Sequence, residues 1–432
     1  MTTKFYPTRL DFSPAVFRSV GFGTPACTAV AGFSGADFSP LGNPAKSVHR
    51  PPAQVEQQDR REAVRKSRSE RFALLGVARR LLLNAGRAAG LEHPSDYHRT
   101  ADCHHASLGS GVAIKRATEH GGAFYAGVAT CGNVWACPVC AAKVQERRRE
   151  EIAAGICWAY REGLQPVMVT LTFPHRSWHK LSALLTQQDD ALKRLRRGRP
   201  WSRFIDSVGY RGLIRSLEVT HGENGWHPHT HELWFVRADA DAEAIRAEVA
   251  QQWESACARA GLLNMDDAAQ VEAFRAHAVD VRGNCSASDY LAKQDDSRHW
   301  GADRELAKSS TKAGRAKGLH AFGLLADAAE GNSRAGRLFL AYVLAMKGRR
   351  QLFWSHGLKA VVGLDAKTDE EVAAEEREQS ELLGVMTAPE WEAVVRAGLR
   401  AALLTAAERG GWPDVRFLLD AIVPPTDPPP PL

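Results

Sequence analysis

The segment GWHPHTHELWFV, residues 225–236, places histidines at every second position and then runs into apolar residues. Successive side chains of a β-strand point to opposite faces, so His227, His229 and His231 would all project from one side. The pattern therefore predicts a strand that carries three imidazoles on one face and continues into the core.

A partner strand is predicted at 211–220, RGLIRSLEVT, and the linker His221–Gly225, HGENG, is suited to a hairpin turn. If the turn centres on Glu223–Asn224, Glu218 lies across from His229. A carboxylate then joins the imidazole face, and such a set suits a divalent cation such as Mg²⁺, Mn²⁺ or Zn²⁺ with positions left open for water or substrate. The alternative is a surface hairpin with solvated histidines.

The chain has 432 residues, of which 44% are apolar and 25% charged, so it can bury a substantial core and is expected to form more than one compact unit. No apolar run approaches the roughly 20 residues of a membrane span, and the N-terminus lacks the pattern of a secretory signal. We therefore expect a cytoplasmic protein. The net charge of +6 favours a polyanionic partner only weakly.

A cluster of cysteines predicts a second metal site. Cys131, Cys137 and Cys140 lie within ten residues, and Cys103 precedes a hairpin expected at 111–130. Four thiols from two chain segments match tetrahedral structural zinc, whereas free buried cysteines are the alternative. His104 and His105 compete with Cys103 for the fourth position. The remaining cysteines are scattered and are predicted to be unliganded: Cys27, Cys157, Cys257 and Cys285.

The stretch CSASDYLAKQ, residues 285–294, offers a candidate nucleophile. Ser288 and Asp289 can cap a helix there. Tyr290 and Lys293 would share one face of that helix. A phenolate can attack phosphorus if its proton is removed or its charge is offset, and a nearby lysine and a metal on the phosphate supply both effects. Alone, the pair is more commonly a half-buried ring beside a solvated amine.

Over roughly residues 100–365 the chain resembles the rolling-circle plasmid replication initiators of the HUH endonuclease superfamily. VTLTFPH at 169–175 resembles their first motif, and EVTHGENGWHPHTHELWF at 218–235 resembles their metal-binding motif. DYLAKQ at 289–294 resembles their nucleophile motif, and GRRQLFWSHGLK at 348–359 resembles a downstream stretch of many members. These motifs occur in the family's order, and similar initiators carry such a cysteine cluster ahead of the catalytic sheet.

The resemblance implies that His229 and His231 bind a catalytic Mg²⁺ or Mn²⁺ ion together with Glu218, with His227 as a further candidate ligand. Thr230 is less apolar than the family's middle residue. The implied fold is α+β: an antiparallel-sheet HUH core with an N-terminal structural zinc cluster and C-terminal helices.

The resemblance also implies a reaction. Tyr290 would attack a phosphodiester of origin DNA, forming a 5′-phosphotyrosine link and a free 3′-hydroxyl primer. Lys293 would activate the phenol or stabilise charge on the phosphate. Ser286 stands where some members have a glutamate that activates water at termination. The implied partners are plasmid origin DNA, single-stranded or extruded as a hairpin, and a host helicase and DNA polymerase, without a membrane.

Basic and aromatic residues offer contacts to DNA. The segments 193–199 and 308–318 lack acids, although a solvated face is an equal alternative, and Arg147–Arg149 is discounted because two glutamates follow it. Trp201, Trp300 and Trp354 lie near basic residues, but a core role is commoner for tryptophan.

Composition and pattern predict the following order of segments. They are a largely disordered N-terminus (1–55), a basic helical segment (56–100), a zinc-binding hairpin (101–150), the nicking domain (151–320), a helical extension (321–365), a helical C-terminal region (366–423) with a capping box at Thr387–Glu390, and a disordered tail (424–432). Two other functions remain open: a single-strand transposase of the HUH type, and a non-enzymatic zinc-containing regulator that binds DNA.

Overall fold

A computed structural model describes residues 52–93, 96–285, 318–376 and 379–423. The expectations for disorder at residues 1–51 and 424–432 lie outside these ranges. The helix placed on Tyr290 and Lys293 also lies outside them. Among the described residues, no helix is both long enough and apolar enough to cross a membrane.

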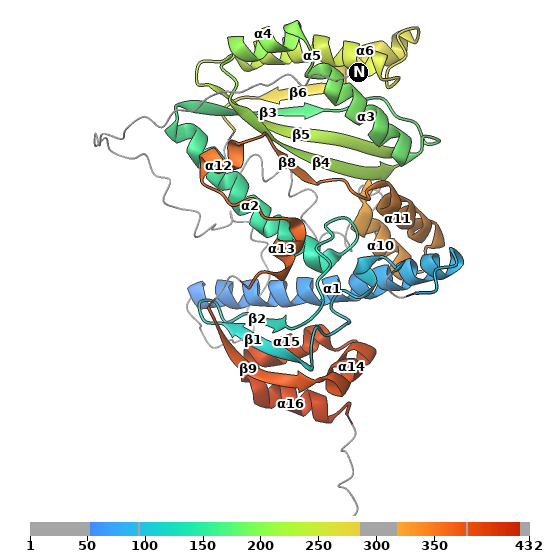
Figure 1. Ribbon diagram of the computed structural model, residues 1–432, viewed down its shortest axis with the longest axis vertical. Coiled ribbons are helices and arrows are strands. Elements are labelled where there is room, and N and C mark those ends of the chain that lie inside the picture. Colours follow the sequence, from blue (N-terminus) through green and yellow to red (C-terminus); the bar gives the residue numbers. More distant parts are fainter. Residues whose placement is uncertain (1–51, 94–95, 286–317, 377–378, 424–432) are drawn as a thin grey trace, which may run out of the picture. The chain divides into compact units, whose positions relative to one another are not determined.

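The larger sheet is antiparallel and is drawn in the upper half of Figure 1, with strand order β6-β3-β5-β4-β7 and with β8 also paired to β4. Its strands are β3 (Leu164–Leu171), β4 (Gly212–Gly222), β5 (Gly225–Arg237), β6 (Val279–Arg282), β7 (Leu319–His320) and β8 (Leu352–Trp354). The strands predicted at 166–173, 211–220 and 226–236 are thus confirmed as the three central ones. The predicted α+β class with an antiparallel sheet is confirmed with them.

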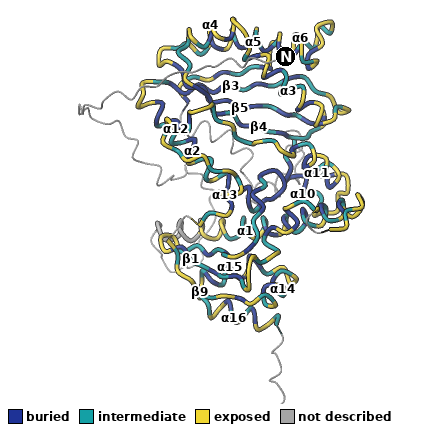
Figure 2. Tube along the Cα trace, in the orientation of Figure 1, coloured by how far each residue is buried: buried dark blue, intermediate teal, exposed yellow. Residues whose placement is uncertain are grey.

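Alternate residues of the central strands fill two separate apolar cores. Trp234 and Val236 of β5 belong to the larger core, together with residues of α3 (Leu181–Leu195), α4 (Arg199–Ser207), α5 (Ala242–Arg259) and α6 (Ala268–His277). Leu233 and Phe235 belong to the smaller core with α2 (Pro138–Arg161) and α12 (Leu358–Val362). Figure 2 shows β3 and β5 buried over most of their length. A strand covered on both faces reads as a continuous apolar run, which explains LWFV.

The β4–β5 hairpin has the predicted register. Gly222 pairs with Gly225 across a two-residue turn, and Glu218 pairs with His229. On this face the odd-numbered residues of β5 change character along the strand: His227, His229 and His231 come first, and Leu233 and Phe235 follow. The helix α2 covers the apolar end, so the polar end is left for a site.

A second, three-stranded sheet joins segments from both ends of the chain in the order β2-β1-β9. The strands are β1 (Gly111–Ala117), β2 (Ala123–Ala126) and β9 (Ser380–Thr387). The hairpin expected at 111–130 is confirmed. Four helices pack on this sheet or on one another beside it: α1 (Pro52–Ala88), α14 (Ala388–Ala397), α15 (Arg400–Gly410) and α16 (Trp412–Asp420). The capping box at Thr387 and Glu390 is present at the start of α14.

The helices and strands differ in places from the segments expected from the sequence. The C-terminal region 366–423 is not helical throughout: α13 covers only Asp369–Ala374, and β9 follows. That strand forms because Met386 is buried and the backbone pairs with β1, some 270 residues earlier in the chain, beyond the reach of a local pattern. The boundary at 150/151 falls inside α2, and α1 already begins at Pro52. The extension at 321–365 contains helices α10 (Ala321–Ala329) and α11 (Ser333–Ala345), but it also returns β8 to the central sheet.

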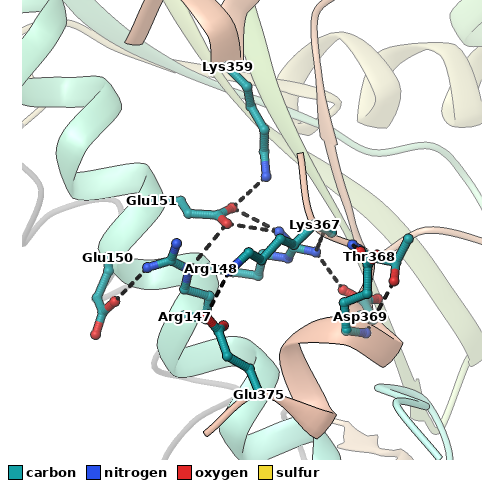
Figure 3. A network of polar contacts seen from close by, with 10 residues as sticks. Arg147, Arg148, Glu150, Glu151, Lys359, Lys367, Thr368, Asp369 and Glu375 are labelled. Carbon is teal, nitrogen blue, oxygen red and sulfur yellow. Dashed lines mark hydrogen bonds and ion pairs between the residues drawn. The ribbon is translucent and has the colours of Figure 1, made fainter. Parts of the chain in front are cut away.

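A buried ionic network fixes α2 to the segments that follow the sheet (Figure 3). The Glu151 side chain is 1% exposed, and it accepts hydrogen bonds from Arg148 at 2.9 Å and Lys359 at 2.8 Å. Arg148 also contacts Asp369 at the start of α13. The side chains of Arg147, Arg148 and Arg149 therefore each pair with an acidic residue. Such pairing was the reason for discounting this run as a DNA contact.

Candidate catalytic and metal-binding sites

Three side chains on the polar face of the β4–β5 hairpin converge on one point. Oε2 of Glu218 lies 3.3 Å from Nε2 of His229 and 3.3 Å from Nε2 of His231. The three ligand atoms all lie within 4.8 Å of one another, a spacing that could hold a metal ion. The hairpin register produces this convergence, because residues paired across an antiparallel ladder share a face.

Hydrogen bonds at the far sides of the rings orient both imidazoles. Nδ1 of His231 lies 3.0 Å from Oγ1 of Thr170 on the neighbouring strand β3. Nδ1 of His229 faces the backbone carbonyl of His227 at 3.4 Å. Such outer contacts set ring orientation and leave Nε2 as the ligand atom.

The charges and hydrogen-bonding roles of this group suit a bound cation. Since Nδ1 of His229 faces a carbonyl oxygen, it must carry the proton, and the Nε2 of a neutral ring is then an acceptor. That acceptor faces a carboxylate oxygen at 3.3 Å, so either a second proton or a metal ion must lie between them. Burial alone would raise the pKa of Glu218, but the interactions with His229 and His231 outweigh it and hold the pKa well below its usual range. The carboxylate is therefore ionised and available as a ligand.

His227 lies beside this group but is not part of it. Its Nε2 lies 2.8 Å from Oγ1 of Thr172, and its ring stacks on that of His175 with centroids 4.7 Å apart. Burial, reinforced by the neighbouring His229, lowers the pKa of His227 to about 3, so the ring is neutral at pH 7. The Nε2 atom of His227 therefore contacts Thr172 and lies outside the group of Glu218, His229 and His231.

The four predicted cysteines lie together. Sγ of Cys103 is 3.4 Å from Sγ of Cys140 and 3.6 Å from that of Cys137, and Cys131 is 3.8 Å from Cys140. A tetrahedral ion with sulfur ligands at about 2.3 Å requires sulfurs about 3.8 Å apart, so the donor set fits zinc. All four side chains are buried.

Backbone geometry prepares these sulfurs for a metal. Cys137 caps the start of α2, where the N–H of Cys140 donates to its Sγ at 3.4 Å. The N–H of Asn133 donates to Sγ of Cys131 at 3.5 Å. Hydrogen bonds from Cys103 and the other thiols lower the pKa of Cys131, whereas burial raises that of Cys137.

The histidines that competed for the fourth position lie outside the sulfur group. His104 accepts a hydrogen bond from Arg400 on its backbone carbonyl, and His105 accepts one from Trp391 in the same way. Both contacts tie the cysteine segment to the C-terminal helices. Of the scattered cysteines, Cys157, Cys257 and Cys285 belong to neither metal group, and Cys27 lies outside the described residues.

Several residues near the site were not singled out from the sequence. Thr170 and Thr172 lie in the motif VTLTFPH, but neither was assigned a role from the sequence. Their alternation at the end of β3 was the signal that could have identified them. His320 and Tyr342 line a cavity together with Glu218; His320 reaches it through the long-range pairing of β7 with β4, and Tyr342 reaches it from α11. No local pattern could have identified them.

Other sequence candidates have the following outcomes. Tyr290, Lys293 and Ser286 lie outside the described residues, as do Trp300 and all of 308–318 except Gly318. In the basic segment 193–199, Arg194 pairs with Asp190 and Arg196 with Glu232. Trp201 is buried against Trp234, and Trp354 packs in the smaller core beside Lys359.

Comparison with known proteins relates the chain to replication proteins. Residues 124–395 match a family model described as "Replication protein". The chain is 27% identical over 366 residues to "Protein rep" of Streptomyces lividans, covering 69% of this chain and 79% of that one. It is 32% identical over 152 residues to the "Neomycin resistance protein" of Streptomyces cyanogenus, covering 29% of this chain and 35% of that protein. No solved structure matches the chain.

The matched region contains the whole β4–β5 hairpin, three of the four clustered cysteines and the segment of Tyr290. The chain belongs to this family of replication proteins. The resemblance to plasmid replication initiators, inferred from the motifs, is confirmed at that level.

Proposed function

We propose that the protein initiates rolling-circle replication of a plasmid by nicking and rejoining one strand at the double-strand origin. The observation that carries this proposal is the convergence of Glu218, His229 and His231 on one face of the sheet. A non-enzymatic regulator would have no need of that convergence. Membership of the replication protein family supports the choice of plasmid origin DNA as the substrate.

Glu218, His229 and His231 would hold a divalent ion, Mg²⁺ or Mn²⁺, through one oxygen and two nitrogens. When bound, the ion would polarise the scissile phosphate and offset the charge that develops on its oxygens. Thr170 keeps the His231 ring turned so that Nε2 faces the ion. Three protein ligands leave positions open for phosphate oxygens and water.

Tyr290 is proposed as the nucleophile. Its phenolate oxygen attacks phosphorus, the bond from phosphorus to the 3′-oxygen breaks, and the leaving oxygen takes a proton to become a 3′-hydroxyl. The phosphate remains joined to Tyr290 as a 5′-phosphotyrosine. Lys293 stabilises the phenolate or the phosphate charge. Because one phosphodiester is exchanged for another, the reverse reaction reseals the strand without a nucleotide cofactor.

The described residues on either side of this segment support the assignment. Cys285 belongs to the apolar core on the same face of the sheet as His231, and its N–H donates to Pro166 of β3. Tyr290 follows five residues later in the sequence. After the segment, Leu319 and His320 pair with His221 and Thr220 of the hairpin. Both ends of the segment are thus joined to the sheet that carries the metal group.

The cysteine cluster is proposed to bind zinc and to serve structure. Cys137 and Cys140 form the first turn of α2, and the later part of that helix covers the apolar end of the site's face. A bound ion would hold the start of this helix against Cys103 and Cys131.

After nicking, the 3′-hydroxyl would serve a host polymerase as primer, and a host helicase would unwind the template.

Formation of a covalent protein–DNA adduct tests the proposal. The purified chain is incubated with 3′-end-labelled single-stranded oligonucleotides that tile the non-coding DNA beside its reading frame, with Mg²⁺ or Mn²⁺ or with chelator. We expect a labelled band at protein mass that chelator abolishes and that Tyr290→Phe lacks, whereas Tyr97→Phe keeps it. A wild-type protein that forms no adduct with any oligonucleotide contradicts the proposed function, and an undiminished adduct in Tyr290→Phe removes that residue as nucleophile.

A further inference from the structure

The loop that follows β3 exposes a tryptophan beside the metal group. Its sequence at 174–180, PHRSWHK, contains two formally positive side chains and no acid. Trp178 is 75% exposed, whereas every other tryptophan in the described ranges is buried or half-buried. The exposed indole leaves a large apolar ring face open to a partner, beside two cationic side chains.

Contacts with the hairpin place this loop at the border of the site. The ring of His175 stacks on that of His227 with centroids 4.7 Å apart and planes 13° apart. Gly225, at the end of the hairpin turn, has φ +83°, and a Cβ added there would lie 2.8 Å from Cα of Ser177. The loop therefore packs on the turn of the β4–β5 hairpin and on His227, which lies two residues from His229 along the strand.

A tight turn fixes the direction of the indole. The N–H of Arg176 donates to Nδ1 of His179 at 3.2 Å, and the N–H of His179 returns a hydrogen bond to the carbonyl of Arg176 at 3.0 Å. Trp178 contacts the ring of His179 edge-on, with centroids 5.8 Å apart. Arg176 and Lys180 flank the indole, and both are exposed.

We propose that this loop binds single-stranded DNA next to the metal group, with Trp178 stacked on a nucleobase and with Arg176 and Lys180 against neighbouring phosphates. An exposed aromatic ring between cations fits a polyanion with accessible base faces, and base pairing in a duplex hides those faces. The inference rests on the proposed function for its choice of DNA as partner. It adds a contact that holds the strand beside the scissile phosphate.

Binding without cleavage tests the inference. The full chain is titrated, in the presence of chelator, with a fluorescein-labelled single-stranded oligonucleotide that the wild type binds, and a set of probes replaces each nucleotide in turn by an abasic residue. Trp178→Ala is expected to weaken binding by roughly 5- to 150-fold, as loss of one stacked base predicts, and Trp178→Phe should retain most of the affinity. Arg176→Ala and Lys180→Ala should each lower the slope of log K against log salt by about 0.7.

Phe417→Ala is the matched control, since Phe417 is 76% exposed on α16, in the C-terminal helices. Its affinity should equal that of the wild type. One abasic position should weaken the wild type but not Trp178→Ala, because both changes remove the same stack. Wild-type affinity in Trp178→Ala, or equal sensitivity of both proteins to every abasic position, overturns the inference. The two proposals can fail separately. If the wild type forms no adduct but Trp178→Ala still weakens DNA binding, nicking is refuted and the DNA-binding surface is supported.

Discussion

Glu218 and His229 face each other across the β4–β5 hairpin, and Oε2 of the carboxylate lies 3.3 Å from Nε2 of the imidazole. A two-residue turn between Gly222 and Gly225 sets this pairing. A register shift of one residue would move His229 and His231 to the opposite face of the strand. The candidate metal group is thus a direct consequence of the hairpin geometry.

The three histidines of β5 should differ in function. His229→Ala and His231→Ala each remove a ligand atom from the group around Glu218, so we expect both to lose nicking that added Mn²⁺ does not restore. His227→Ala removes a ring that contacts Thr172 and His175, and activity should fall less. Nicking of supercoiled plasmid DNA across a Mn²⁺ titration measures the difference. Equal losses in all three variants would mean that the ligand pair is misassigned.

Thr170 should tune metal affinity, although it touches no metal. Its hydroxyl lies 3.0 Å from Nδ1 of His231, and loss of such an outer contact typically weakens metal binding by about 10- to 100-fold. Thr170→Val is therefore expected to raise the Mn²⁺ concentration needed for half-maximal nicking by roughly that factor. Thr172→Val is the matched control, because it removes the same group from His227 instead. Identical Mn²⁺ requirements in both variants would exclude an orienting role for Thr170.

The cysteine cluster should carry about one zinc ion per chain. Cys140→Ser removes one of the four buried sulfurs, and we expect the zinc content measured by plasma mass spectrometry to fall sharply. Protection of the backbone amides of Cys137 to Ala141 from hydrogen exchange should fall with it. The control is Cys257→Ala, at a buried cysteine outside the group, which should keep its zinc. Zinc retained after Cys140→Ser would argue against a four-cysteine site.

Glu151 should be important for stability. Its buried carboxylate accepts hydrogen bonds from Arg148 and Lys359, so Glu151→Gln removes the counter-charge of Lys359 and one of the two acidic partners of Arg148 (Figure 3). Loss of one partner from a buried ion pair costs about 3 kcal/mol of unfolding free energy, which urea denaturation can measure. Glu150→Gln, at a neighbouring side chain that is 47% exposed, should change stability by less than about 0.5 kcal/mol. Comparable losses in both variants would show that burial of Glu151 is not the cause.

The hairpin could be predicted from the sequence because its information is local. Alternating histidines specify a strand, and a turn of defined length then specifies which residue faces Glu218. The four cysteines were predictable for a similar reason, since their spacing and residue type already carry the chemistry. Both predictions rest on short-range geometry.

Features that depend on distant pairing were not predictable. β9 contains glutamate and glycine and was expected to be helical, but its pairing with β1 and the burial of Met386 decide its conformation. Thr170 gained its role only when β3 was placed beside β5. Tertiary context outweighs local preference at such positions. The roles of Tyr290 and Lys293 remain predictions from the family resemblance.

The central claim is that Tyr290 becomes covalently joined to the 5′-phosphate of DNA under the control of the Glu218, His229 and His231 group. Mass spectrometry of the proteolysed adduct, after nuclease trimming, identifies the modified residue directly. We predict a nucleotide-bearing peptide that contains Tyr290, formed with Mg²⁺ or Mn²⁺ and absent from His231→Ala. A nucleotide found on any other residue, or an adduct that forms equally well in His231→Ala, would contradict the account.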